Sequence, residues 1–158
     1  MYLIDDRDEV SKLDGLPLPS AGAPMPRLLA NDIGLVLAYE TAPDGPHIAV
    51  VKFIRPRAHY FGPPNDEGLT GHPLALRGLE PYGLFEIRHS SWIRAQERMN
   101  RVHPGHDAQR FEALMHFVLT FHDRTFECIA EGVGLVETLV NDPKAMQILP
   151  NVMAGHAD

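Results

Sequence analysis

The chain has 158 residues and a single cysteine, Cys128, so an intrachain disulfide is excluded. Absence of disulfides is typical of proteins in a reducing compartment. The sequence also lacks an apolar run of about 20 residues, the length that a membrane-spanning helix needs. Residues 1–15 are acidic and lack the apolar segment of a signal peptide. We therefore expect a cytoplasmic protein without a membrane partner.

Positive charge is scarce as well, since the formal net charge is −7 at pH 7. Nucleic acids and anionic membranes bind basic surfaces, so we expect neither as a partner. The balance permits a basic protein partner, or a small ligand that is neutral or cationic. It also permits a homo-oligomer.

Several catalytic motifs are missing. The chain has no G-x-S-x-G, no P-loop and no G-x-G-x-x-G, which leaves no motif for a serine hydrolase or a nucleotide site. Cys128 falls among apolar residues, which predicts a buried small hydrophobe and not a nucleophile. We expect no cofactor.

Metal-binding patterns are weak. The segment HPGH places His103 and His106 three residues apart, and His122 could join them as a third ligand. However, the chain lacks the H-E-x-x-H pattern of zinc proteases. Nine histidines in 158 residues make one close pair easy to obtain by chance. We therefore expect no metal, with this set as the weak alternative.

The pattern of apolar residues predicts a single α+β domain over residues 31–158, preceded by an extended Pro/Gly-rich arm over residues 1–30. Residues 32–40 and 47–57 are rich in β-branched and aromatic side chains, and the turn sequence TAPDGP between them predicts a central hairpin. We expect a mainly antiparallel sheet of about five strands, packed against a few short helices.

Further along, residues 84–90 predict a short strand, and Ser90 or Ser91 predicts the cap of a helix. Apolar residues recur at helical spacing in that helix and predict a stripe facing the core: Trp92, Ala95, Met99 and Val102. Asp107 predicts the cap of a short helix that ends near Leu114. Residues 134–149 predict two short helices, the second starting at Asp142 and Pro143.

Residues 116–132, HFVLTFHDRTFECIAEG, predict a β-hairpin in which Phe121 pairs with Phe126. Because side chains alternate between faces, one face is wholly apolar and predicts core. Its members are Phe117, Leu119, Phe121, Phe126, Cys128 and Ala130. The other face is largely polar, with Thr120 opposite Glu127 and His116 opposite Glu131. Its members are His116, Val118, Thr120 and His122 on the first strand, and Thr125, Glu127, Ile129 and Glu131 on the second.

Two explanations of this polar face remain open. It is either a solvated sheet face, where each compatible cross-strand pair contributes about 0.2–1 kcal/mol, or the floor of a pocket. The loop over residues 58–83 is dense in glycine and proline and would close the pocket. It brings more polar groups: His59, Tyr60, Asn65, Asp66, Glu67 and His72. Paired imidazoles and carboxylates at a covered site can act as general acids and bases near neutral pH.

The segments FGPPNDEG, SSWI and FHDRTFEC lie within residues 59–132. Together they resemble a group of small uncharacterised bacterial proteins. The resemblance implies no activity and no catalytic residue.

Two functional hypotheses follow. The first is a small-molecule-binding protein or enzyme with a histidine-rich polar site on the hairpin face under the 58–83 loop. Its candidate catalytic residues are His122, Glu127 and His59, and its candidate binding residues are Tyr60, Asn65, Asp66, His116 and Thr120. The second is an acidic interaction protein, similar to an immunity protein or antitoxin, that binds a basic protein partner.

Overall fold

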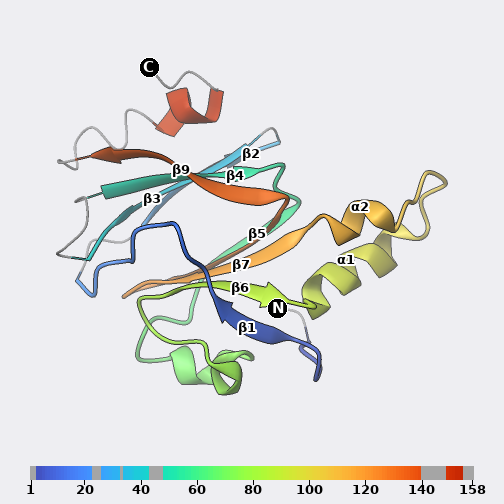
Figure 1. Cartoon of the computed structure of the whole chain (residues 1–158), viewed down its shortest axis with the longest axis horizontal. Helices are drawn as coiled ribbons and strands as arrows, with labels where there is room; N and C mark the ends of the chain where they lie inside the picture. Colours follow the sequence, from blue (N-terminus) through green and yellow to red (C-terminus); the bar gives the residue numbers. More distant parts are fainter. Residues whose placement is uncertain (1–2, 23–25, 33, 43–47, 140–148, 155–158) are drawn as a thin grey trace.

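The computed structural model describes residues 3–22, 26–32, 34–42, 48–139 and 149–154. Within these residues, nine strands form two antiparallel sheets flanked by short helices (Figure 1). The first sheet has the order β1-β6-β7-β8-β5, namely β1 (Glu9–Lys12), β6 (Leu84–Arg88), β7 (Met115–Thr120), β8 (Thr125–Ala130) and β5 (Ala58–Gly62). The second has the order β2-β3-β4-β9, namely β2 (Arg27–Asn31), β3 (Gly34–Glu40), β4 (Ile48–Ile54) and β9 (Gly132–Leu139). The prediction of mainly antiparallel sheet with a few short helices is confirmed, but a single sheet of about five strands was wrong.

The two sheets bury one apolar face each against the other, as in a sandwich (Figure 1). The second sheet contributes Leu35, Leu37, Tyr39, Ala49, Val51 and Phe53 to this core, and the first contributes Leu84, Phe117, Leu119, Phe121, Phe126, Cys128 and Ala130. The rings of Phe53 and Phe126 meet across the interface with centroids 5.1 Å apart. Alternation along each strand places the remaining side chains on the two outer faces.

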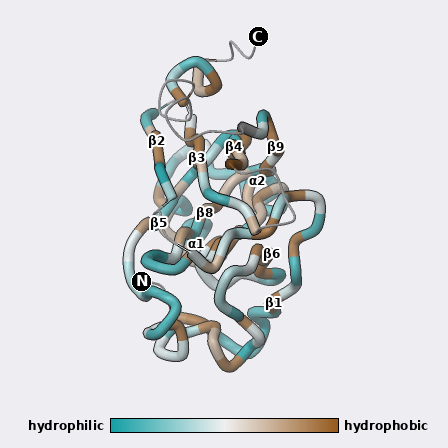
Figure 2. Tube along the Cα trace, turned by 90° about the vertical axis from the view of Figure 1, so that its left-hand side faces the viewer, coloured by the Kyte–Doolittle hydropathy of each residue, from teal (hydrophilic) through white to brown (hydrophobic). Residues whose placement is uncertain are grey.

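Both outer faces are also covered, as the side view in Figure 2 shows. Residues 149–154 are helical, and Leu149 and Val152 pack on the outer face of the second sheet. The outer face of the first sheet is covered by leucines around two 3₁₀ helices, η1 (Leu69–Gly71) and η2 (Ala75–Arg77). The first sheet is therefore covered on both faces, so a polar residue on β7 or β8 can be buried whichever face it occupies.

Helix α1 (Ser91–Asn100) begins at the predicted cap, where Ile93 N–H donates to Ser90 Oγ at 3.3 Å. It is followed by the short α2 (Gln109–Glu112), and the two helices project from the sandwich (Figure 1). The prediction that the stripe on α1 faces the core was wrong, since Ser91 is the buried residue of this helix. Met99, near the end of α1, is 61% exposed, and Val102, just beyond it, is 90% exposed, because this end of the helix reaches beyond the sheets.

The hairpin of β7 and β8 differs from the prediction by two residues. Phe126 pairs with Leu119 and not with Phe121, and Glu127 lies opposite Val118 and not Thr120. Phe121 instead begins the turn, where its N–H donates to Arg124 O. Since the side-chain period of a strand is two, a shift of two residues keeps every side chain on its predicted face.

Other predicted segments need correction. The expected arm over residues 1–30 contains β1 and β2, which pair with β6 and β3. Residues 58–62 of the expected loop form β5 at the edge of the first sheet. Residues 132–139 form β9 and pair with β4, so the helix predicted there was wrong. The predicted start of the last helix, at Asp142 and Pro143, lies outside the described residues. Among the helices of the described segments, none has the length and hydropathy needed to cross a membrane.

Candidate functional site

Glu127, on β8, is 1% exposed and lies between two buried imidazoles. Its Oε1 is 3.2 Å from His72 Nε2, and its Oε2 is 3.1 Å from His116 Nε2. His72 follows η1 and His116 lies on β7, so the carboxylate ties the cover of the sheet to the sheet itself. Buried polar groups need partners of this kind. We call His72, His116 and Glu127 the Glu127 cluster.

The hydrogen bonds of His72 decide its tautomer. Leu74 N–H donates to His72 Nδ1 at 3.1 Å, so Nδ1 carries a lone pair. His72 is therefore a neutral imidazole whose Nε2–H donates to Glu127, an assignment made from the hydrogen-bond network. The second imidazole has its Nδ1 2.9 Å from Ser90 Oγ, and the Ser90 hydroxyl can supply that proton.

Ser90, His116 and Glu127 follow one another in the order of a serine–histidine–acid relay. Ser90, however, is 3% exposed, and its Oγ also accepts the N–H of Ile93 as the helix cap. The next N–H in the chain, that of Ser91, donates to the buried carboxylate of Asp8 at 2.6 Å. A carboxylate thus occupies a place where an acyl-transfer enzyme needs a donor for the oxyanion. The geometry favours a structural role for Ser90.

One cavity, of about 400 Å³, reaches the Glu127 cluster. We call it the Glu127 pocket, and its lining consists of His59, Tyr60, Trp92, Ala95, Gln96, Met99 and Glu127. Tyr60, on β5, lies directly opposite Glu127 and shares its face. Trp92, on α1, packs edge-on against His116 with ring centroids 5.1 Å apart. The pocket therefore lies between an edge strand and a helix, and Glu127 is part of its lining.

The predicted residues His122 and Asp66 form a second cluster with Tyr82. His122 Nδ1 lies 3.0 Å from Asp66 Oδ2, and the Tyr82 hydroxyl donates a short hydrogen bond to the same oxygen. This hydrogen bond from Tyr82 is the main cause that lowers the pKa of Asp66, and the Glu67 N–H and His122 lower it further. Conversely, the carboxylate raises the pKa of Tyr82. The side chain of His122 is 43% exposed, so the cluster closes the 63–68 turn at the surface.

The structure thus places the predicted residues in separate sites. Glu127, His116 and Tyr60 come together, but His122 belongs to the Asp66 cluster. His59 borders the Glu127 pocket, but it pairs with Cys128 and so belongs to the opposite face of β5. The remaining two contact backbone atoms outside both clusters: Thr120 Oγ1 donates to Glu80 O at 2.7 Å, and Asn65 Oδ1 accepts the N–H of Gly68.

The weak metal set is not assembled. His103 Nδ1 accepts the N–H of Gly105, and His106 contacts Asn100 and Glu97 at the far end of α1. His122, by contrast, lies in the turn after β7. In the described part of the chain, no group of three histidine, cysteine or acidic side chains is placed to hold a metal ion.

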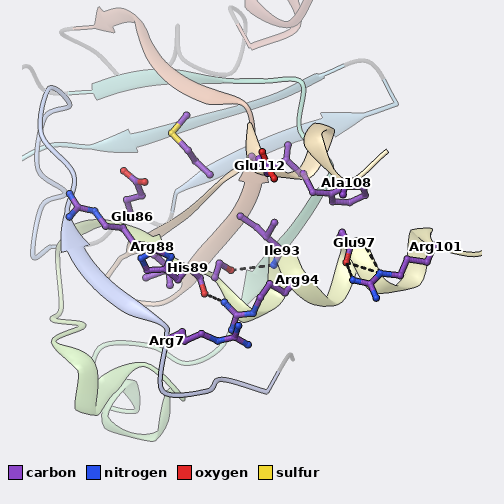
Figure 3. A pocket seen from close by; sticks show the side chains of 15 residues that line it. Arg7, Glu86, Arg88, His89, Ile93, Arg94, Glu97, Arg101, Ala108 and Glu112 are labelled. Carbon is purple, nitrogen blue, oxygen red and sulfur yellow. Dashed lines mark hydrogen bonds and ion pairs between the residues drawn. The ribbon is translucent and has the colours of Figure 1, made fainter. Parts of the chain in front are cut away.

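A larger cleft, of about 730 Å³, lies on the other side of α1, between that helix, α2 and β6 (Figure 3). Several of its charged side chains pair with protein groups. Arg101 donates to Glu97 at 2.8 Å and lowers the pKa of that carboxyl, and Arg94 contacts Asp5 at 2.7 Å. The large cleft contains no predicted site residue within the described segments. We therefore regard the Glu127 pocket as the candidate site.

No family model, no curated protein and no solved structure matches the chain. The resemblance to small bacterial proteins stays a prediction. Sequence reasoning missed four residues that line the Glu127 pocket: Trp92, Ala95, Gln96 and Met99. Trp92 and Met99 recur at helical spacing, which predicts a helix face packed on the core. A helix that borders a pocket has the same pattern of apolar residues, so the sequence does not distinguish the two.

Proposed function

We propose that this protein binds a small molecule in the Glu127 pocket. The observation that carries the proposal is the position of Glu127, a carboxylate that is 1% exposed and yet borders a cavity of about 400 Å³. Pockets of a few hundred Å³ with apolar and aromatic walls and a few fixed polar groups are typical of small-molecule sites. Trp92, Tyr60 and Met99 supply such walls, and the two imidazoles hold the carboxylate in one orientation.

A proton-transfer role for Glu127 is the enzymatic form of this proposal. A general base must be held within hydrogen-bond reach of the proton that it removes. The imidazoles of the cluster limit the rotation of the carboxylate, which supports such a role. Binding is the simpler function, because it requires only the pocket and its fixed groups.

The chain contains one tryptophan, Trp92, and it lines the pocket, so its fluorescence reports binding at this site. We expect a fragment library to yield compounds that change this fluorescence in a saturable manner. Ala95→Phe, which fills the pocket from α1, should abolish the response. The matched control is Ala108→Phe, which places the same side chain in the large cleft, and it should leave the response intact. A library without any compound sensitive to Ala95→Phe would contradict the proposal.

The second candidate, a protein that binds a basic partner, gains some support from the exposed side chains of Met99, on α1, and Val102, in the turn after it. Nearby charges oppose it, since this region carries several arginines, namely Arg94, Arg98, Arg101 and Arg110. A basic partner would be repelled there. We therefore place small-molecule binding first.

A further inference from the structure

We infer that the ligand of the Glu127 pocket is an elongated organic carboxylate, whose apolar group lies in that pocket and whose anionic group is held by Arg57 and Arg110 in the cavity beside it. The inference rests on the proposed function and adds the chemical class of the ligand. It follows from the way the two cavities adjoin, from the charge of their linings, and from the ion pairs of the two arginines.

A second cavity of about 400 Å³ adjoins the Glu127 pocket. We call it the Arg110 pocket, and its lining consists of Arg57, Gln96, Met99, Asn100, Arg110, Phe111 and Leu114. Gln96 and Met99 line both cavities. These two residues are three apart on α1 and therefore share one face of the helix. The cavities lie side by side along this face, so one extended ligand can occupy both.

The lining of the Arg110 pocket favours an anion. It contains two arginines, and among the described residues neither an aspartate nor a glutamate lines it. Gln96 and Asn100 add side-chain amides that can donate hydrogen bonds. The Glu127 pocket differs, because a carboxylate belongs to its described lining and no arginine or lysine does. We therefore place the anionic group of the ligand at the Arg110 end and its uncharged part at the Glu127 end.

Both arginines are held by long ion pairs. Arg57 lies 3.7 Å from Glu131, and the same carboxylate has Arg55 at 3.0 Å. Two guanidinium groups thus share one negative charge, which leaves an excess of positive charge beside the pocket. Arg110 lies 3.5 Å from Asp107 in a pair of exposed side chains, and such pairs contribute little to stability. Both guanidinium groups can therefore turn to a ligand carboxylate, with which they form strong paired hydrogen bonds.

A carboxylate suits this pocket better than a phosphate ester. The net charge of −7 opposes anions at long range, and it opposes a phosphate group, with a charge of about −1.5 to −2, more strongly than a carboxylate. Salt screens charges that are farther apart than about 8 Å at physiological ionic strength. The two arginines therefore decide the interaction at close range.

The walls of the Glu127 pocket match the uncharged part of such a ligand. Trp92 and Tyr60 present aromatic surface, against which an aromatic or apolar group packs well. Met99, which lines both cavities, adds a polarisable apolar side chain between the two ends. A ring joined by a short chain to a carboxylate therefore fits the pair of cavities.

The test compares 4-phenylbutanoate with 4-phenylbutanamide, a neutral probe of nearly the same shape, by titration of Trp92 fluorescence at pH 7. We expect the carboxylate to bind at least about tenfold more tightly at low ionic strength. This preference should shrink as salt is added, because the arginines are exposed. Ala95→Phe should abolish the binding of both probes.

The double variant Arg57→Gln/Arg110→Gln should erase the preference for the carboxylate and leave the affinity for the amide nearly unchanged. Both side chains are exposed, at 54% and 75%, so the variant should fold, which circular dichroism checks. The matched control, Arg98→Gln/Arg101→Gln, removes two positive charges from exposed residues that line neither cavity. It should preserve the preference.

Equal affinity of the two probes, with both sensitive to Ala95→Phe, would overturn the inference and leave the proposed function standing. A carboxylate preference that survives Arg57→Gln/Arg110→Gln would overturn it, as would a preference that the control variant erases to the same extent. Absence of binding by either probe at millimolar concentration would overturn it too, and the fragment library would then decide the proposed function separately.

Discussion

Replacing His72 by alanine should reduce the free energy of unfolding by about 3–5 kcal/mol. Two buried hydrogen bonds are lost. Glu127 loses the N–H of His72, and a hydrogen bond to a charged group contributes about 1.5–3 kcal/mol. Leu74 N–H loses its acceptor, and an unsatisfied buried donor costs about 1–3 kcal/mol. Because a domain of this size has a stability of about 5–15 kcal/mol, the loss should be easy to measure.

The assay is urea denaturation followed by circular dichroism, with stability taken from the midpoint and the slope. His72→Gln is the informative second variant. Its amide nitrogen reaches about as far as Nε2 and can still donate to Glu127, but it provides no acceptor for Leu74. We expect it to recover roughly half of the loss. His59→Ala removes an exposed imidazole from β5 and should change stability by less than about 0.5 kcal/mol.

A loss below about 1 kcal/mol for His72→Ala, with an unchanged slope, would refute this reasoning. Such a result would mean that water replaces both hydrogen bonds at little cost. The Glu127 cluster would then be solvated, and its carboxylate would not depend on His72 for its burial.

Three further predictions concern the rest of the molecule. The pKa of Asp66 is lowered in the folded state, so this carboxyl stabilises the protein above the unfolded pKa of about 3.9, and the stabilisation is lost as pH falls through the folded pKa. Between pH 7 and pH 2, the melting temperature of Asp66→Asn should therefore fall less steeply than that of the natural sequence. Phe126→Ala should cost about 3–5 kcal/mol in urea denaturation because the ring is fully buried between the sheets, whereas Met99→Ala, at an exposed position, should cost less than about 1 kcal/mol. Burial raises the pKa of the Cys128 thiol, so a thiol reagent at pH 8 should label this residue only after unfolding, and rapid labelling of the native protein would contradict its placement.

The hairpin of β7 and β8 shows how far local pattern reaches. Alternation assigned every residue of both strands to the correct face, because the period of two is a property of the strand alone. The pairing was wrong by two residues, since it depends on the turn. Phe121 and Arg124 close the connection by a backbone hydrogen bond, and this makes Thr120 and Thr125 the last pair. A shift of two residues has no signature in the apolar pattern.

Residues 132–139 illustrate a limit of another kind. The sequence GVGLVETL contains leucine, valine and glutamate in an order compatible with helix or strand over so short a length. Pairing with β4 decides the outcome, and β4 lies about 80 residues earlier in the chain. The strand is also interrupted by a shift of register beside Val50 and Val51, which blurs the alternation further. Tertiary pairing outweighs local preference here.

The position of Glu127 depends both on local alternation and on tertiary contacts. Its face could be predicted because alternation places it opposite the apolar side of β8. Its burial could not, because a glutamate can be buried only with partners, and those partners lie 55 and 11 residues away in the sequence. One of them, His72, is held by a turn whose leucines pack on the same sheet. The carboxylate, the turn and α1 therefore depend on one another, and a variant that removes the charge of Glu127 but keeps its shape is required to separate ligand binding from folding.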